Sequence, residues 1–165
     1  MKTLLLVRHA KSDWDAGVFS DFERPLNERG KKDAPAMAAR LFEKKIPIDG
    51  ILASSAKRAA KTAKAFAGVY GLEKEKISFL AGLYLPAAAT FYPVIESAPD
   101  DWDHLAVFSH NNGITDFANE LTNARIDNIP TCGIFAVKVY TDSWKDFREA
   151  RKEFWFFDSP KSPRH

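Results

Sequence analysis

The sequence predicts an α/β fold: a three-layer α/β/α sandwich with a mostly parallel central sheet and an antiparallel edge. Short apolar runs alternate with stretches of helical spacing in the order β-α-β-α-β-α-β-α-β-β. Because parallel strands are joined by crossovers through helices, this alternation places helices on both faces of one sheet. The last two strands follow each other without a helix between them, which predicts an antiparallel pair at one edge.

The first strand is expected at residues 3–7, an apolar run typical of a central strand that is buried on both faces. Residues 10–26 then form a long connection, and loops of this length in small domains are usually functional. Asn27 can cap the first helix, whose buried face is predicted from apolar residues at helical spacing. Pro35 lies inside this helix and predicts a kink or restart near Asp33.

The second strand is expected at residues 50–54 and the second helix at residues 57–70. Gly71 follows directly, where a left-handed residue commonly ends a helix. A short third strand is expected near residues 77–79. This middle part of the chain therefore continues the strand–helix alternation.

Thr90 can cap a third helix, with the following proline in its first turn. The fourth strand is expected at residues 105–109 and the fourth helix at residues 113–121. The chain closes with two expected strands, residues 133–140 and 153–157. The aromatic run in the last strand is typical of a strand covered on both faces.

Length and composition indicate one domain over residues 1–165. The 18.5 kDa chain is 45% hydrophobic and 28% charged, which is typical of globular proteins and argues against disorder. A net charge of +2 is too small to indicate nucleic-acid binding, and the N-terminal apolar run is too short for a signal peptide or a membrane span. Cys132 is the single cysteine, so a reducing cytoplasm is expected and Cys132 is predicted to be buried.

Charged and imidazole side chains follow three of the expected parallel strands. Arg8 and His9 end the first strand, Arg58 follows the second, and His110 and Asn111 end the fourth. Ligands of open α/β sheets bind where the carboxyl ends of the strands meet helix N-termini. Two guanidinium groups and two imidazoles at one edge would form a pocket for a dianionic phosphoryl group.

Four ordered segments resemble the histidine phosphatase superfamily, the phosphoglycerate-mutase-like enzymes. The segments are Leu4–Ala10 (LLLVRHA), Arg24–Leu26 with Gly30, Ser54–Ala59 with Thr62, and Ser109–Gly113 (SHNNG). Ala10 stands where the family commonly has glycine, and Asn112 where proline is common. The short length and the closing aromatic stretch are most similar to the SixA branch of phosphohistidine phosphatases.

The resemblance implies that His9 is the nucleophile of a phosphatase with a covalent phosphohistidine intermediate. Arg8, Arg58 and a cationic His110 would bind the phosphoryl oxygens, while Arg24 and Asn111 would bind substrate. A neutral His9 requires that a carbonyl or carboxylate accept the proton on its other ring nitrogen. No metal or other cofactor is implied, and the expected substrate is a phosphorylated protein or a small phosphorylated metabolite.

The acid with which larger family members protonate the leaving oxygen has no counterpart here, because residues 78–95 contain no Asp or Glu. Imidazole leaves far more easily than an alkoxide, so this absence favours phosphohistidine as substrate. Asp13 or Asp21 in the long loop remain candidate acids. Only 51 residues separate Arg58 from His110 (110 − 58 − 1), which leaves no space for a cap domain.

Other functions remain open from the sequence alone. The same pocket could serve a small-molecule phosphomonoesterase, or a non-catalytic module that binds phosphate. A metal site formed by His9 and His110 is disfavoured, because the neighbouring arginines would repel a cation. Trp14 is expected either at the mouth of the pocket or as an anchor of the long loop.

Overall fold

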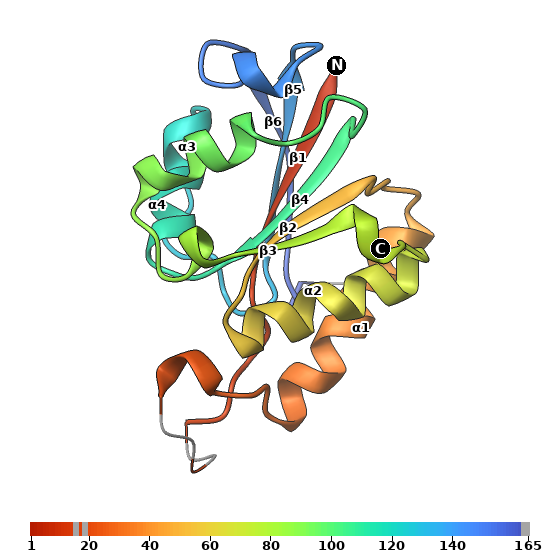
Figure 1. The fold of residues 1–165 in the computed structure, drawn as a ribbon, viewed down its shortest axis with the longest axis vertical. Helices are drawn as coiled ribbons and strands as arrows, with labels where there is room; N and C mark the ends of the chain where they lie inside the picture. The colour runs from red at the N-terminus through yellow and green to blue at the C-terminus, as the bar shows by residue number, and fades with distance from the viewer. Residues whose placement is uncertain (15–16, 18–19, 163–165) are drawn as a thin grey trace.

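The computed structural model describes residues 1–14, 17 and 20–162. Its order of strands and α-helices is the predicted one. Figure 1 shows the six strands running through the middle of the molecule, with helices on either side. The strands are β1 (Lys2–Arg8), β2 (Gly50–Ser54), β3 (Ile77–Leu80), β4 (His104–Ser109), β5 (Ile134–Tyr140) and β6 (Arg151–Asp158).

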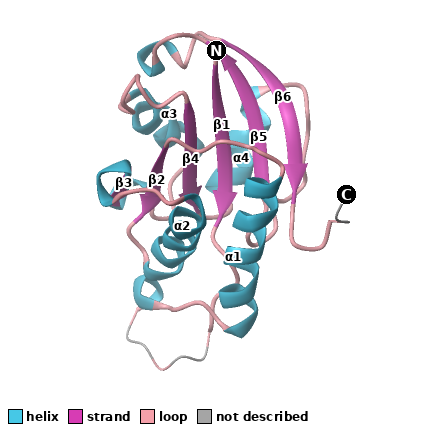
Figure 2. Cartoon of the chain, turned by 90° about the vertical axis from the view of Figure 1, so that its right-hand side faces the viewer, coloured by secondary structure: helices cyan, strands magenta, loops and turns pink. Residues whose placement is uncertain are grey.

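The strands form one mixed sheet in the order β3-β2-β4-β1-β5-β6. The pairs β1/β4, β2/β4 and β2/β3 are parallel, whereas β5 is antiparallel to both β1 and β6. The predicted central position of β1 and the antiparallel edge are therefore confirmed. Because β1, β2 and β4 run in the same direction, their carboxyl ends meet at one edge of the sheet (Figure 2).

Two helices cover each face of the sheet. The helices are α1 (Glu28–Glu43), α2 (Lys57–Tyr70), α3 (Ala88–Glu96) and α4 (Gly113–Leu121). Figure 2 shows α1 and α2 together in front of the strands, while α3 and α4 lie behind them. Alternate residues of β1 point to the two sides: Leu5 joins the core beneath α1 and α2, and Leu6 joins the core beneath α3 and α4.

The helix boundaries largely follow the sequence signals. The Asn27 side chain accepts the Gly30 N–H at 2.9 Å, and α1 continues as one helix through Pro35. Gly71 ends α2 with φ +66°, as its position predicted. The expected cap at Thr90 is wrong, because α3 begins two residues earlier at Ala88.

The long connection and the last strand also differ from simple expectation. Ser12 forms an isolated antiparallel bridge with Leu26, and residues 21–23 form a 3-10 turn, so part of the connection is ordered. Residues 15–16 and 18–19 lie outside the described chain. In β6, Phe154 and Phe157 are 39% and 36% exposed, which contradicts the prediction of a strand covered on both faces. The reason is that β6 lies at the edge of the sheet.

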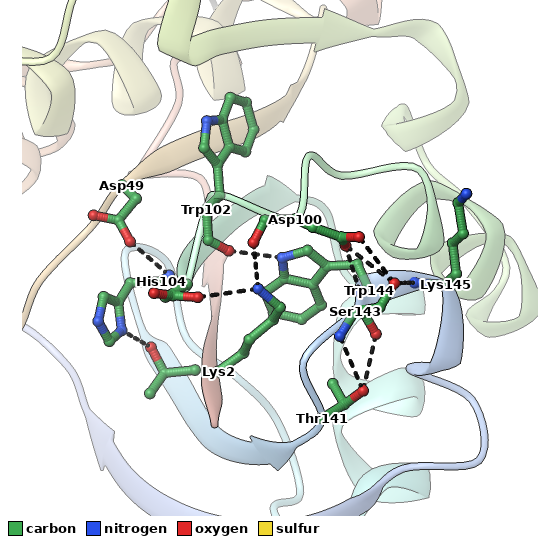
Figure 3. Close-up of polar contacts among 11 residues, drawn as sticks. Lys2, Asp49, Asp100, Trp102, His104, Thr141, Ser143, Trp144 and Lys145 are labelled. Atoms are coloured by element: carbon green, nitrogen blue, oxygen red, sulfur yellow. Dashed lines mark hydrogen bonds and ion pairs between the residues drawn. The ribbon is translucent and has the colours of Figure 1, made fainter.

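A polar network closes the opposite, N-terminal end of the strands (Figure 3). The buried Lys2 ammonium group donates to the Asp100 carbonyl at 2.6 Å and to the Asp103 carboxylate at 3.1 Å. It also lies 5.5 Å from the centre of the Trp144 ring. Lys2 therefore connects the start of β1 to residues 100–103 and to Trp144. Among the described residues, no helix is long and apolar enough to cross a membrane.

Candidate active site

The three strand ends converge as the sequence predicted. Arg8 lies opposite Ser109 in the parallel β1/β4 pair, which places His9 and His110 beside each other after the strands. Their ring centres are 5.1 Å apart. Arg58 reaches the same place from the first turn of α2. The residues surround a cavity of about 390 Å³, lined by Arg8, His9, Lys11, Ser12, Trp14, Asp21, Arg24, Arg58, Leu85, His110, Asn111 and Thr131.

A hydrogen bond fixes the His9 ring so that its Nε2 atom carries a lone pair. Its Nδ1 atom lies 2.7 Å from the Ala10 carbonyl oxygen, an acceptor only, so this nitrogen carries the proton. The Nε2 atom therefore bears the lone pair, towards which Arg58 Nε–H donates at 3.3 Å. Burial lowers the pKa of His9 to about 4, and the charges of Arg58 and Arg8 act in the same direction. At neutral pH the imidazole is thus neutral, and its Nε2 atom carries no proton.

Three arginines bring hydrogen-bond donors to this cavity. Arg24 and Arg58 are 7% and 2% exposed, and Arg24 donates to the Ser12 hydroxyl at 2.9 Å. Arg8 donates one N–H to the Ile129 carbonyl at 2.9 Å. The buried Arg8 Nε has no hydrogen-bond partner among the described residues. Leaving a buried donor without a partner costs free energy, so Arg8 is held here at some expense to stability.

The Asp21 carboxylate lies among these donors. Its oxygens accept hydrogen bonds from Arg24 Nε and Arg58 at 2.9 Å each, and from the Tyr84 hydroxyl at 2.6 Å. The Asp21 carbonyl also accepts from Arg58 at 2.7 Å. Partial burial acts to raise the pKa of Asp21, but the hydrogen bonds from Tyr84 and Arg58 lower it to about 2. The carboxylate is therefore ionised and occupies donors that could bind a phosphoryl group.

His110 differs from the expected cationic donor. Burial lowers the pKa of His110 to about 3, and the nearby His9 and Arg58 add to the effect. Its Nε2 atom lies 2.7 Å from the Ser54 hydroxyl, and its buried Nδ1 has no partner among the described residues. At neutral pH His110 is thus neutral. The sequence showed its position at a strand end but not the number of cations around it.

The remaining sequence candidates lie in the cavity with other partners. Asn111 lines it, but its amide group donates to Asn128 and its carbonyl accepts from Thr115. Trp14 is 79% exposed, and the Arg24 guanidinium stacks 3.4 Å from its ring centre, so Trp14 lies at the mouth. Cys132 is buried as predicted, and burial raises the pKa of its thiol.

Sequence reasoning missed several residues that the fold adds to the site. Tyr84, which directly follows a 3-10 turn after β3, donates to Asp21 and packs 5.4 Å from the His110 ring. Lys11 and Thr131 line the cavity, and no motif marked any of the three. Among the described residues, no group of three His, Cys, Asp or Glu side chains is arranged to hold a metal ion.

Comparisons with known sequences match part of the chain to one family. Residues 4–84 match the histidine phosphatase superfamily (branch 1). An uncharacterised chloroplastic protein of Arabidopsis thaliana is 28% identical over 153 residues, which are 88% of this chain and 70% of that protein. A metal-independent phosphoserine phosphatase of the same plant is 33% identical over 106 residues, 58% of this chain. The aligned part spans 44% of that enzyme's length.

Solved structures show the same fold. The putative phosphohistidine phosphatase SixA from Nakamurella multipartitia superposes with a TM-score of 0.83 at 20% identity, covering 98% of this chain and 97% of that one. SixA complexed with tungstate gives 0.80 at 21% identity, covering 96% and 97%. The sequence match over residues 4–84 is to the histidine phosphatase superfamily, and the fold of the chain is the one seen in the SixA structures. Together these matches support a phosphatase as the class of protein.

Proposed function

We propose that the chain is a phosphatase that uses His9 as its nucleophile and acts on phosphohistidine in a protein. One observation carries the proposal. The His9 imidazole is neutral, presents Nε2 to a cavity, and is fixed by its Nδ1–H bond to the Ala10 carbonyl at 2.7 Å. Three arginines around it supply the donors that a phosphoryl group in transfer requires.

In the first step, the Nε2 lone pair of His9 attacks phosphorus, and the bond from phosphorus to the substrate nitrogen breaks. The departing nitrogen keeps the bonding electron pair and takes a proton from solvent. Arg8, Arg24 and Arg58 hold the phosphoryl oxygens. Arg58 Nε–H moves from His9 to a phosphoryl oxygen as the lone pair becomes engaged.

In the second step, water attacks phosphorus on the face opposite His9. The bond from phosphorus to Nε2 breaks, His9 regains its lone pair, and the attacking water gives one proton to solvent as orthophosphate forms. His110 lies 5.1 Å from His9 and is placed to contact the phosphoryl group. A dianion there would raise the pKa of His110 by opposing the surrounding positive charge.

The preference for a phosphorus–nitrogen bond rests on the ionised state of Asp21 and on the lack of Asp and Glu in residues 78–95. Asp21 is ionised by its arginine and tyrosine partners, so at neutral pH it offers no proton to a leaving group. The hydrogen bond to Asp21 also raises the pKa of the Tyr84 hydroxyl. Imidazole has a conjugate acid pKa of about 6.5 and needs less help than an alkoxide, which favours phosphohistidine.

Access to the site supports a protein substrate. We propose that the chain works as a single domain without a cap, because α2 and β4 are linked only by short elements. The exposed Trp14 and the half-exposed Leu85 border the cavity and would contact the substrate surface. The proposed cytoplasmic location rests on the single buried cysteine, Cys132.

A small-molecule phosphomonoesterase is the second candidate. The observation that favours it is the 33% identity to a metal-independent phosphoserine phosphatase. With such a substrate, a serine alkoxide would have to leave, and this chain has no counterpart of a protonated carboxyl in residues 78–95. The two candidates therefore differ in the leaving group that the enzyme tolerates.

The test is turnover of a phosphohistidine peptide, a phosphoserine peptide and a set of sugar phosphates under identical conditions. The proposal predicts a kcat/KM for phosphohistidine that exceeds the others by about 10² or more, the usual effect of a general acid. His9→Ala should abolish turnover of every substrate. Equal or better turnover of phosphoserine would favour the second candidate, and no turnover at all would favour a binding module.

A further inference from the structure

A second, smaller cavity adjoins the catalytic one, and we call it the flanking pocket. Its volume is about 200 Å³, against about 390 Å³ for the catalytic cavity. Both cavities are lined by Lys11 and Thr131, which therefore form a wall between them. The other polar walls of the flanking pocket come from the first turns of α1 and from the segment after β6, through Arg29, Asp33, Ser159 and Lys161.

The shared wall is fixed relative to His9 by backbone contacts. The Lys11 carbonyl accepts the Asn27 N–H at 3.0 Å, and a Cβ at Gly30 would lie 2.1 Å from that carbonyl oxygen. On the other side, the Cys132 N–H donates to the carbonyls of Arg8 and His9 at 3.0 Å each, which positions the preceding Thr131. The two cavities therefore keep a constant spacing.

The outer wall of the flanking pocket is also held in place by hydrogen bonds. Arg40 of α1 donates to the Ser159 carbonyl and to the Asp158 carboxylate, both at 2.9 Å. The Ser159 hydroxyl lies 3.0 Å from the Ser162 hydroxyl, and Ser159 is 7% exposed. These contacts hold the segment after β6 against α1. The pocket is consequently formed without a ligand.

The flanking pocket carries an excess of positive charge. Arg29 lies 3.1 Å from the Asp33 carboxylate, so these two charges are paired with each other. Lys11 and Lys161 have no acidic partner within the part of the chain that the structure describes. Three cations and one carboxylate leave two positive charges beside a site that already attracts anions.

We propose that the flanking pocket binds an Asp or Glu carboxylate of the substrate protein, next to the phosphorylated side chain, and so selects substrates with an acidic flank. The inference rests on the proposed function and names its substrate class more closely. Small-molecule sites usually enclose about 300–1,000 Å³, so a pocket of about 200 Å³ suits one side chain. The lysines of the pocket, Lys11 and Lys161, would attract a negatively charged carboxylate.

The expected effect is moderate and appears in binding. Ion pairs between exposed groups are individually weak, so two lysines should favour an acidic flank about three- to tenfold in kcat/KM. The preference should reside mainly in KM, because the flank does not touch the reacting atoms. It should shrink as salt is raised, because exposed charges are screened.

The experiment compares two phosphohistidine peptides that differ only in Glu or Gln on both sides of the phosphorylated residue. The enzymes are the wild type, the double variant Lys11→Gln/Lys161→Gln, and the control Lys74→Gln, whose lysine precedes β3 at the opposite edge of the sheet. The wild type and the control should prefer the Glu peptide about three- to tenfold, while the double variant should treat both peptides almost equally.

An aryl phosphate, which has no flank, separates this inference from the proposed function. The wild type could turn over the aryl phosphate and both peptides with the same kcat/KM for the two peptides. That result would overturn only the proposed role of the flanking pocket. A double variant that kept the wild-type preference would overturn it as well. No turnover of any of the three substrates would instead overturn the proposed function, and the inference with it.

Discussion

Burial among cations sets the protonation of the two active-site histidines. Burial lowers the pKa of His9 to about 4 and that of His110 to about 3, and the Arg58 charge adds to both effects. The unfolded chain would hold these imidazoles near the ordinary value of about 6.5. Folding therefore favours the neutral forms, which the proposed attack by His9 requires.

This shift predicts how stability depends on pH. Between about pH 6.5 and pH 4 the unfolded state binds more protons than the folded state at both histidines, so stability falls as the pH is lowered through this window. Thermal unfolding of wild type and His110→Gln from about pH 7 to about pH 4.5 tests the point. The variant should lose less stability over this range, whereas an identical loss would show that His110 is not held neutral.

Asp21 acts as an internal anion among the arginines of the candidate site. Its carboxylate accepts from Arg24, Arg58 and Tyr84, so an incoming phosphoryl group competes with it for donors. Asp21→Asn should therefore bind orthophosphate or tungstate more tightly, by about two- to tenfold, as calorimetry would measure. Weaker oxyanion binding in this variant would mean that Asp21 is needed to hold the arginines in place.

Among the elements, the start of α1 presses against the loop that follows β1. A methyl group at Gly30 would lie 2.1 Å from the Lys11 carbonyl, so Gly30→Ala should destabilise the fold by about 1–3 kcal/mol. It should also raise KM, because the neighbouring Ser12 accepts a hydrogen bond from Arg24, a proposed substrate-binding residue.

Gly68→Ala in α2 is the matched control. With no atom within 4 Å, it should stabilise by about 0.5–1 kcal/mol. Denaturant unfolding and steady-state kinetics of both variants measure these effects, and equal stability would contradict the close contact.

The elements were predictable where a local signal exists. Asn27 and Gly71 mark helix ends through their own backbone preferences, and the apolar run of β1 indicated a central strand. The cap at Thr90 was wrong, because α3 starts at Ala88 without any side-chain cap.

The site was predictable only in part, for a related reason. Arg8, His9 and His110 could be brought together because parallel strands share an edge. The pairing of Asp21 with Tyr84 joins residues 63 positions apart, and no periodicity encodes it. The neutral state of His110 likewise depends on burial and on cations from other elements, which the sequence alone does not display.

At the scale of the whole molecule, the topology brings positively charged side chains together at the carboxyl ends of the parallel strands. Arg8, Arg24 and Arg58 converge on the cavity from β1, the long loop and α2. In the proposed mechanism these charges take the place of a metal ion, and they would repel a cation. Turnover should therefore survive EDTA, measured beside a metal-dependent phosphatase as control. Loss of activity that a divalent ion restores would count against the proposed role of the arginines.

The proposed mechanism depends above all on His9 carrying the phosphoryl group between substrate and water. The most direct test is a rapid-quench reaction with a ³²P-labelled phosphoramidate, followed by peptide mapping of wild type and His9→Ala. We expect a label on His9 that is labile in acid and stable in base, because phosphorus is bonded to nitrogen, and no label in the variant. A label on a serine or aspartate, or full turnover by His9→Ala, would contradict this mechanism.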